Sequence, residues 1–186
     1  MTGNTREASP LGPVAIGLYV LLPFGIGYFL SQMFRSVNAV VGPDLVRDVG
    51  LGAAELGLLT SAYLLAFALF QLPLGVLLDR YGPRRVQSVL IALAGVGSLL
   101  FAIGESFLVL TAARALIGLG FAGGLMSGFK AVVLWVPDKR RALANAVVMS
   151  FGALGIIVAT QPVDMSVQAF GWRAVFLGLG LHLGQD

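Results

Sequence analysis

The stretch "GVLLDRYGPRR", Gly75 to Arg85, separates two long apolar runs. Twenty-three uncharged residues, 56–78, precede Asp79, and nineteen more, 86–104, follow Arg85. Apolar runs of about 18 residues or more are typical of transmembrane helices. One carboxylate and three arginines therefore lie in a short loop between two predicted membrane spans.

The composition of the whole chain indicates a polytopic membrane protein. Of its 186 residues, 58% are hydrophobic and 11% are charged, whereas soluble domains carry roughly a quarter of charged residues. The net charge is +3, but the basic residues form short clusters between apolar runs, as membrane topology requires. We therefore expect no nucleic-acid partner. Without cysteine and with one histidine, the sequence offers no zinc cluster, and we expect neither a metal nor a cofactor.

Six hydrophobic segments are predicted, with membrane lipid around them. The first begins near Pro13, a residue favoured in a first helical turn, and ends before Gly42–Pro43. The sixth is incomplete, because only about 20 Å of helix follows Arg173 and a span needs roughly 30 Å. The predicted spans are about 13–42, 56–78, 86–103, 107–135, 142–161 and 172–184.

Lysine and arginine residues in the loops predict the orientation, since cytoplasmic loops are enriched in them. Seven fall on one side and two on the other. This asymmetry predicts a multi-pass protein of the bacterial inner membrane with a cytoplasmic N-terminus. The seven are Arg6, Arg80, Arg84, Arg85, Lys139, Arg140 and Arg141, and the two are Arg47 and Arg173.

Asp79 stands at the C-terminal end of the second span, where the helix dipole disfavours a carboxylate. We expect the three arginines of the loop to compensate it. Gly82 permits a tight reversal, and Gly75, one turn before Asp79, offers a smooth surface to another helix. An ordinary positive loop with one compensated acid is the alternative, which explains the arginines but neither Asp79 nor the glycines.

Three motifs resemble the major facilitator superfamily. "GVLLDRYGPRR" resembles the family signature between spans two and three: Gly, three residues, Asp, a basic residue, any residue, Gly, any residue and two basic residues. "RALIGLG", Arg114 to Gly120, resembles the Arg-x-x-x-Gly-x-Gly pattern of span four, with Ile117 where Gln is common. "GWRAVF", Gly171 to Phe176, resembles the entry to span six. The resemblance implies an all-α membrane fold: the N-terminal six-helix half of a twelve-helix transporter, whose missing C-terminal half would be a partner.

In that family the loop between spans two and three is a cytoplasmic gate whose charges help to hold the inward side closed. The resemblance implies the same role for the matching positions of this chain. These gating residues are Gly75, Asp79, Arg80, Gly82, Arg84 and Arg85.

Polar residues inside the first and fourth spans suggest a solute site, because charges at membrane depth usually face a cavity or a partner. Tyr28, Ser31, Arg35 and Asn38 have the spacing of one helical face. Arg35 lies about 9 Å and Arg114 about 10 Å below the outer ends of their spans. Matched depth predicts one electropositive site shared by the two arginines.

The alternative is separate local roles. Arg114 could pair with Glu105 and Arg35 with Asp44, or either could extend toward the outer surface. The second span adds polar side chains close to one face, and we expect Lys130 to reach the cytoplasmic surface rather than a solute. The candidate substrate-binding residues are Tyr28, Arg35, Asn38, Tyr63, Gln71 and Arg114.

The predicted function is secondary active transport of a small solute by alternating access, with the site between two six-helix halves. Cavity arginines favour an anionic solute, because guanidinium binds carboxylate and phosphate in a bidentate manner; a coupling ion is left open. The alternative is a non-transporting fragment of such a transporter. We expect no enzyme, since the chain has neither a nucleophile–base pair nor a phosphate loop. Multidrug efflux is disfavoured, because "SFGALGIIVATQP" lacks the glycine-proline pattern of drug antiporters.

Overall fold

The computed structural model describes residues 12–183, and all regular structure in this range is helical. Arg6 and Gly184, two residues of the predicted topology, lie outside it. Five helices are long and apolar enough to cross a membrane: Val14–Val49, Ala53–Tyr81, Pro83–Ile103, Phe107–Trp135 and Asp138–Ala159. The elements are α1 (Pro13–Ile16), η1 (Gly17–Leu21), α2 (Leu22–Val49), α3 (Ala53–Tyr81), α4 (Pro83–Ile103), α5 (Phe107–Gly120), α6 (Gly124–Trp135), α7 (Asp138–Ala159), α8 (Gln161–Phe170) and α9 (Trp172–Leu183).

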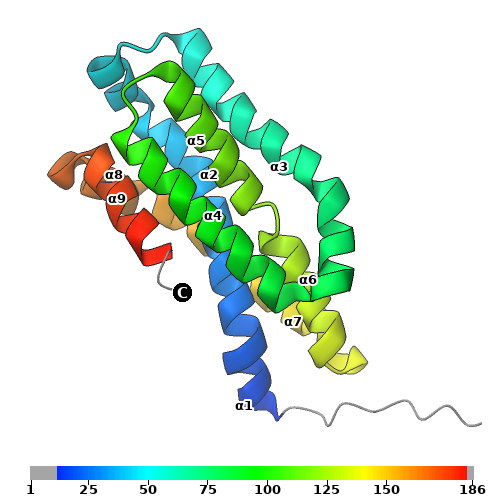
Figure 1. Cartoon of the computed structure of the whole chain (residues 1–186). Coiled ribbons are helices and arrows are strands. Elements are labelled where there is room, and N and C mark those ends of the chain that lie inside the picture. Colours follow the sequence, from blue (N-terminus) through cyan, green and yellow to red (C-terminus); the bar gives the residue numbers. More distant parts are fainter. Residues whose placement is uncertain (1–11, 184–186) are drawn as a thin grey trace, which may run out of the picture.

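The helices form one bundle in which α2 packs chiefly against α7, α3 against α5, and α4 against α5 and α9. The reversal between α3 and α4 and the connection between α6 and α7 lie toward the end of the bundle where α1 begins (Figure 1). The connections from α2 to α3 and from α4 to α5 lie at the opposite end. The two arginine-rich loops are therefore on the same side of the molecule, as the charge pattern predicts.

The first span is longer than predicted. It contains one π-helical turn, η1, just before Pro23, where the ring removes a backbone donor and crowds the preceding turn. The helix then continues through Gly42–Pro43 to Val49, so the predicted end before Gly42 is wrong for the helix. Proline is tolerated inside membrane helices, and the end is set instead by Gly50, whose φ of 76° is left-handed.

The fourth span is divided into α5 and α6 by a turn at residues 121–123. The sequence predicts one uninterrupted segment from 107 to 135. The break frees backbone carbonyl groups, and side chains from two other helices bind them. Ser31 Oγ of α2 donates to the Phe121 carbonyl at 3.3 Å, and Gln71 Nε2 of α3 donates to the Ala122 carbonyl at 3.1 Å.

Glycines on this broken span allow close helix packing, as their four-residue spacing indicates. A Cβ at Gly120 would lie 2.6 Å from the Ala94 nitrogen of α4, and one at Gly124 would lie 3.0 Å from Ser31 Cβ. A Cβ at Gly120 would therefore collide with α4, and one at Gly124 would need Ser31 to shift by a few tenths of an ångström.

The motif "GWRAVF" docks α9 onto two neighbouring helices. Trp172 Nε1 donates to Asp48 Oδ2 at 2.9 Å, and Arg173 donates to the carbonyls of Ala102 and Gly104 at 3.2 and 3.0 Å. Gly171, with φ of 79°, turns the chain from α8 into α9. The ten-residue α8 occupies a stretch that the sequence predicts as a connection.

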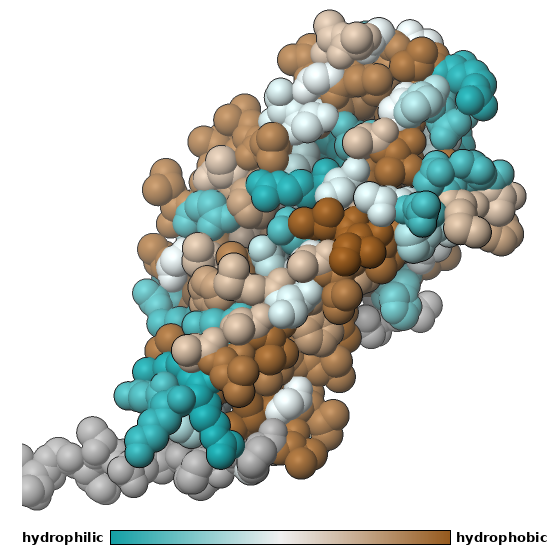
Figure 2. Space-filling model, turned by 180° about the vertical axis from the view of Figure 1, so that it is seen from behind, coloured by the Kyte–Doolittle hydropathy of each residue, from teal (hydrophilic) through white to brown (hydrophobic). Residues whose placement is uncertain are grey.

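The outer surface is that of a multi-pass membrane protein. Large apolar side chains such as Leu72 and Val76 are 83% and 67% exposed. Seen from behind, hydrophobic residues cover much of the molecule, while hydrophilic residues gather toward its ends and in a smaller zone across the middle (Figure 2).

Candidate functional site

Arg114 of α5 is the most buried charged residue in the described range, with 1% of its surface exposed. Its guanidinium lies 4.6 Å from the ring centre of Phe101 and 5.6 Å from that of Phe176. It donates to the Phe34 carbonyl at 3.4 Å and to Asn38 Oδ1 at 2.6 Å, while its Nε has no partner. No carboxylate of the described residues pairs with it. A charge in the membrane interior is therefore held by aromatic faces and neutral acceptors.

Asn38 of α2 connects this buried charge to a groove. Its Oδ1 must face Arg114, because a guanidinium only donates, so its amide nitrogen faces away. That nitrogen donates to Thr60 Oγ1 of α3 at 2.5 Å, and Thr60 in turn donates to the Leu56 carbonyl at 3.1 Å. The orientation of the carboxamide is thus fixed from both sides.

The groove lies between α2, α3 and α7 and has a volume of about 770 Å³, within the range of small-molecule sites. Its polar lining includes Arg35, Ser36, Asn38 and Thr60, and Thr160 comes from the end of α7. Arg35 is exposed, and its guanidinium lies 5.2 Å from the ring centre of Phe67. The structure therefore places one arginine in the groove and the other behind Asn38.

The remaining candidate residues do not line this groove. Tyr63 is buried next to Phe67, with ring centres 6.4 Å apart, and its hydroxyl donates to the Ser31 carbonyl at 3.4 Å. Tyr28 packs against Gly152 of α7 and accepts from Gln32 at 3.1 Å. Gln71 caps the α5–α6 break. Spacing alone could not show the contacts of these residues with Ser31, Gly152 and Ala122, because those partners lie on other helices.

The local pairs considered as alternatives do not form. Asp44 pairs with Arg47 at 3.6 Å rather than with Arg35. Glu105 is exposed, and Arg114 is hydrogen-bonded elsewhere. Arg114 also does not extend to the outer surface, because only 1% of its surface is exposed.

At the other end of the bundle, Asp79 has a different partner from the one predicted. Its Oδ1 lies 2.6 Å from Lys130 Nζ of α6, while none of the loop arginines pairs with it in the described structure. Arg80 instead lies over the ring of Tyr81, 5.4 Å from its centre. We expect Lys130 to extend toward the surface at this end rather than to a solute, and it does extend there and meets the exposed Asp79 carboxylate, because α3 and α6 line one groove.

The two gating glycines behave differently. Gly82 has φ of 80° and makes the predicted reversal before Pro83, the first residue of α4. A Cβ at Gly75 would meet nothing within 4 Å, and Gly75 is exposed. Its smooth surface is therefore not covered by another helix of the described chain.

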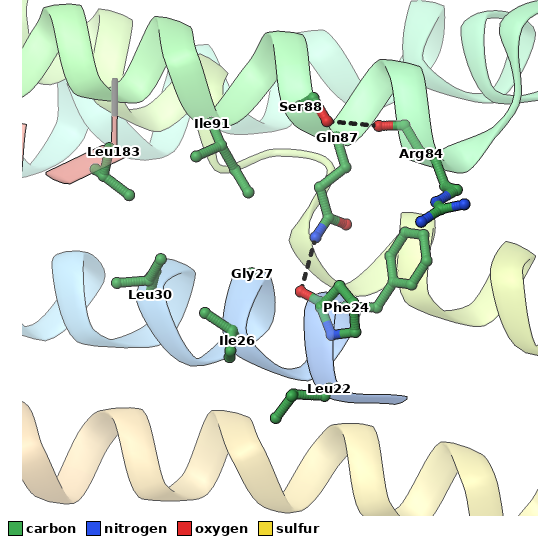
Figure 3. A pocket seen from close by; sticks show the side chains of 11 residues that line it. Leu22, Phe24, Ile26, Gly27, Leu30, Arg84, Gln87, Ser88, Ile91 and Leu183 are labelled. Atoms are coloured by element: carbon green, nitrogen blue, oxygen red, sulfur yellow. Dashed lines mark hydrogen bonds between the residues drawn. The ribbon is translucent and has the colours of Figure 1, made fainter. Parts of the chain in front are cut away.

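A second groove, of about 370 Å³, lies between α2 and α4 (Figure 3). Its walls are mostly apolar. Gln87 reaches across it and donates to the Pro23 carbonyl at 3.3 Å. Among the gating residues only Arg84 lines it, at one end. It holds none of the candidate substrate-binding residues.

Fold and sequence together identify the class of this protein. The chain belongs to the Major Facilitator Superfamily, whose family model matches residues 24–183. The structure is similar to a bacterial homologue of the human lysosomal transporter Spinster in an inward-facing, occupied conformation, with a TM-score of 0.81 and 23% identity over 94% of this chain and 43% of that one. That likeness shows the fold, which is that of the N-terminal six-helix half of such a transporter.

Two curated relatives have different named solutes. The chain is 32% identical over 153 residues to the "Probable sulfoacetate transporter SauU" of Cupriavidus necator, covering 82% of this chain and 36% of the relative. It is 28% identical over 160 residues to the "Multidrug resistance protein Stp" of Mycobacterium tuberculosis (strain CDC 1551 / Oshkosh), covering 86% and 30%. The chain thus spans about a third of the length of these relatives.

Proposed function

We propose that this chain forms the N-terminal half of a secondary transporter of small organic anions. The single observation that carries the proposal is the groove with Arg35 in its wall and the uncompensated Arg114 behind it. Two positive charges that no carboxylate of residues 12–183 pairs with attract an anion, and a guanidinium can bind a carboxylate or sulfonate at two points. The name of the relative SauU, which refers to an anion, agrees with this class.

The solute would lie between this half and the C-terminal half, and alternating access would expose it to each side in turn. In this proposal Arg35 and Asn38 contact the anion, and Arg114 supplies charge from behind. Tyr63 supports the Arg35 side through Phe67, whereas Tyr28 and Gln71 contribute through helix packing. The gating residues lie at the other end of the bundle, on the side where Gly75 is uncovered.

The protein is proposed to lie in the bacterial inner membrane with its N-terminus in the cytoplasm, since the two loops richest in lysine and arginine lie at that end. In this proposal the surface of α3 around Gly75 contacts the missing half, because Gly75 is exposed and no other described helix packs against it. A non-transporting fragment remains the second candidate, favoured by the coverage of about a third of the relatives.

Uptake and binding of radiolabelled sulfoacetate by the purified protein test this function. Proteoliposomes with the complete transporter, in which this chain is the N-terminal half, should accumulate sulfoacetate in a saturable manner, and Arg35→Gln should abolish the uptake. Saturable binding without uptake would support the fragment candidate. If neither occurs, and the protein instead binds the lipophilic cation tetraphenylphosphonium, the solute class is wrong and a drug-type solute replaces it.

A further inference from the structure

The inner end of the groove is built around an amide where a carboxylate would be the ordinary partner. Arginine buried in a protein is usually paired with an acid, because an isolated charge is costly there. Arg114 is buried and its shortest polar contact is the neutral Asn38 Oδ1, at 2.6 Å. Aspartate has the same shape as asparagine and would complete an ion pair at this distance.

We propose that Asn38 sets the charge selectivity of the groove, by binding Arg114 without neutralising it. This inference rests on the proposed function, which supplies the anion. With Asn38 the groove region carries two positive charges, from Arg35 and Arg114; with aspartate it would carry a net charge of one. At membrane depth this difference acts over several ångströms, because screening is weak.

The fixed orientation of the carboxamide adds a second contribution. Its oxygen is occupied by Arg114, so its amide group is the part that faces the groove. One N–H binds Thr60, and the other has no hydrogen-bond partner among the described residues. This N–H lies near Arg35, three residues earlier on the same helix, and donates to an anion rather than to a cation. Asn38 therefore favours anions through both its missing charge and its exposed donor.

The natural absence of cysteine makes the local charge measurable without any solute. A single thiol is introduced by Ala39→Cys, at an exposed position in the groove lining. Its reaction rates with an anionic sulfonatoethyl and a cationic trimethylammonioethyl methanethiosulfonate give a rate ratio. Glu105→Cys, on the exposed loop between α4 and α5, provides the reference ratio outside the groove.

The anionic reagent should be favoured at position 39 relative to position 105. Adding Asn38→Asp should lower this preference by about tenfold, since one opposite charge is placed beside the thiol. Arg114→Gln should lower the preference similarly. It removes one positive charge, so the net charge of the groove region falls by the same one unit. Asn38→Leu, a variant of similar size without charge, should lower the preference less than Asn38→Asp does, because it removes the amide donor but adds no negative charge.

Two results would overturn the inference: no preference at position 39 in the parent, or a preference that Asn38→Asp and Arg114→Gln both leave unchanged. Protection of the thiol by sulfoacetate is measured in the same samples and tests the proposed solute class separately. If the preference depends on Asn38 but sulfoacetate does not protect the thiol, the proposed solute class is wrong. The role of Asn38 in charge selectivity is then still supported.

Discussion

Arg114 is a charge that the fold holds at a cost, because it is buried and its hydrogen-bond acceptors are neutral. Replacing buried ionic groups by apolar residues of similar volume is often neutral or stabilising, by about 1–4 kcal/mol. The double change Arg114→Met with Asn38→Leu removes the charge and its acceptor together. We therefore expect an unfolding free energy equal to or above that of the parent, together with complete loss of sulfoacetate binding.

Thermal and denaturant unfolding in micelles measure the first quantity, and equilibrium dialysis measures the second. The matched single change Arg114→Met should be less stable than the double change, because it leaves Asn38 Oδ1 without its donor. A double variant that is several kcal/mol less stable than the parent would show that Arg114 mainly fastens α5 to α2.

The sequence predicts Arg35, Asn38 and Arg114 as neighbours from helical spacing and depth, and the structure brings Asn38 and Arg114 into contact. It could not predict that one arginine is exposed and the other enclosed, because the enclosing rings of Phe101 and Phe176 come from α4 and α9. Gln71 shows the same limit. Gln71 has the spacing of a polar face, but its side chain binds the Ala122 carbonyl at the turn between α5 and α6. No residue pattern near position 122 predicts that turn.

At the scale of helices, the contact between α3 and α5 depends on one glycine. A Cβ at Gly118 would collide with the Tyr63 carbonyl of α3. Gly118→Ala should therefore separate the two helices and lower the melting temperature by several degrees, as a loss of about 1–3 kcal/mol from overpacking implies. Differential scanning fluorimetry measures this change.

Gly178→Ala is the matched control, since a Cβ there meets nothing within 4 Å inside α9. It should leave the melting temperature unchanged or raise it slightly, because alanine is the better helix former. Equal losses at both positions would show that the collision at Gly118 is relieved without cost.

The contact between α3 and α6 at the opposite end is an ion pair, Asp79 with Lys130. Its partners are 72% and 35% exposed, so it contributes at most about 1 kcal/mol to stability. Asp79→Asn and Lys130→Met should each impair uptake by the complete transporter while membrane abundance stays near that of the parent. The exchange Asp79→Lys with Lys130→Asp should restore part of the uptake, since it rebuilds the pair.

If uptake does not recover in the exchanged variant while each single variant is impaired, the Asp79–Lys130 pair is not what uptake requires. The loop arginines would then be the functional partners of Asp79. The sequence predicts Asp79 at the end of the second span, where the structure has it, but it does not predict the partner of this acid. Lys130 is 51 positions away, and the register of α6 against α3 depends on the break at residues 121–123.

For the molecule as a whole, both arginine-rich loops lie at the end where α1 begins (Figure 1). Topology reporters fused after Arg85 and after Arg141 should both give a cytoplasmic signal, because positive loops are retained on that side. A fusion after Gly50, at the other end of the bundle, should give a periplasmic signal. A periplasmic signal after Arg85 or Arg141 would reverse the proposed orientation.

Apolar runs and three motifs predict the class of fold, because membrane burial requires long uncharged helices whatever the tertiary contacts. Helix ends are less predictable. Gly42–Pro43 is a common stop signal, but the helix continues through it and ends at Gly50, whose backbone is left-handed.

The central claim is that Arg35 and Arg114 act on one anion, and sulfoacetate affinity in a double-variant cycle tests it most directly. Isothermal titration of the parent, Arg35→Gln, Arg114→Gln and the double variant should show at least tenfold weaker binding in each single variant. The loss in the double variant should be smaller than the sum of the two in free energy, since both charges act on the same ligand. Arg35→Lys should retain more affinity than Arg35→Gln, because Arg35 is exposed and a charge there still faces the groove. Additive losses, or an affinity that Arg35→Gln leaves unchanged, would contradict a shared anion site.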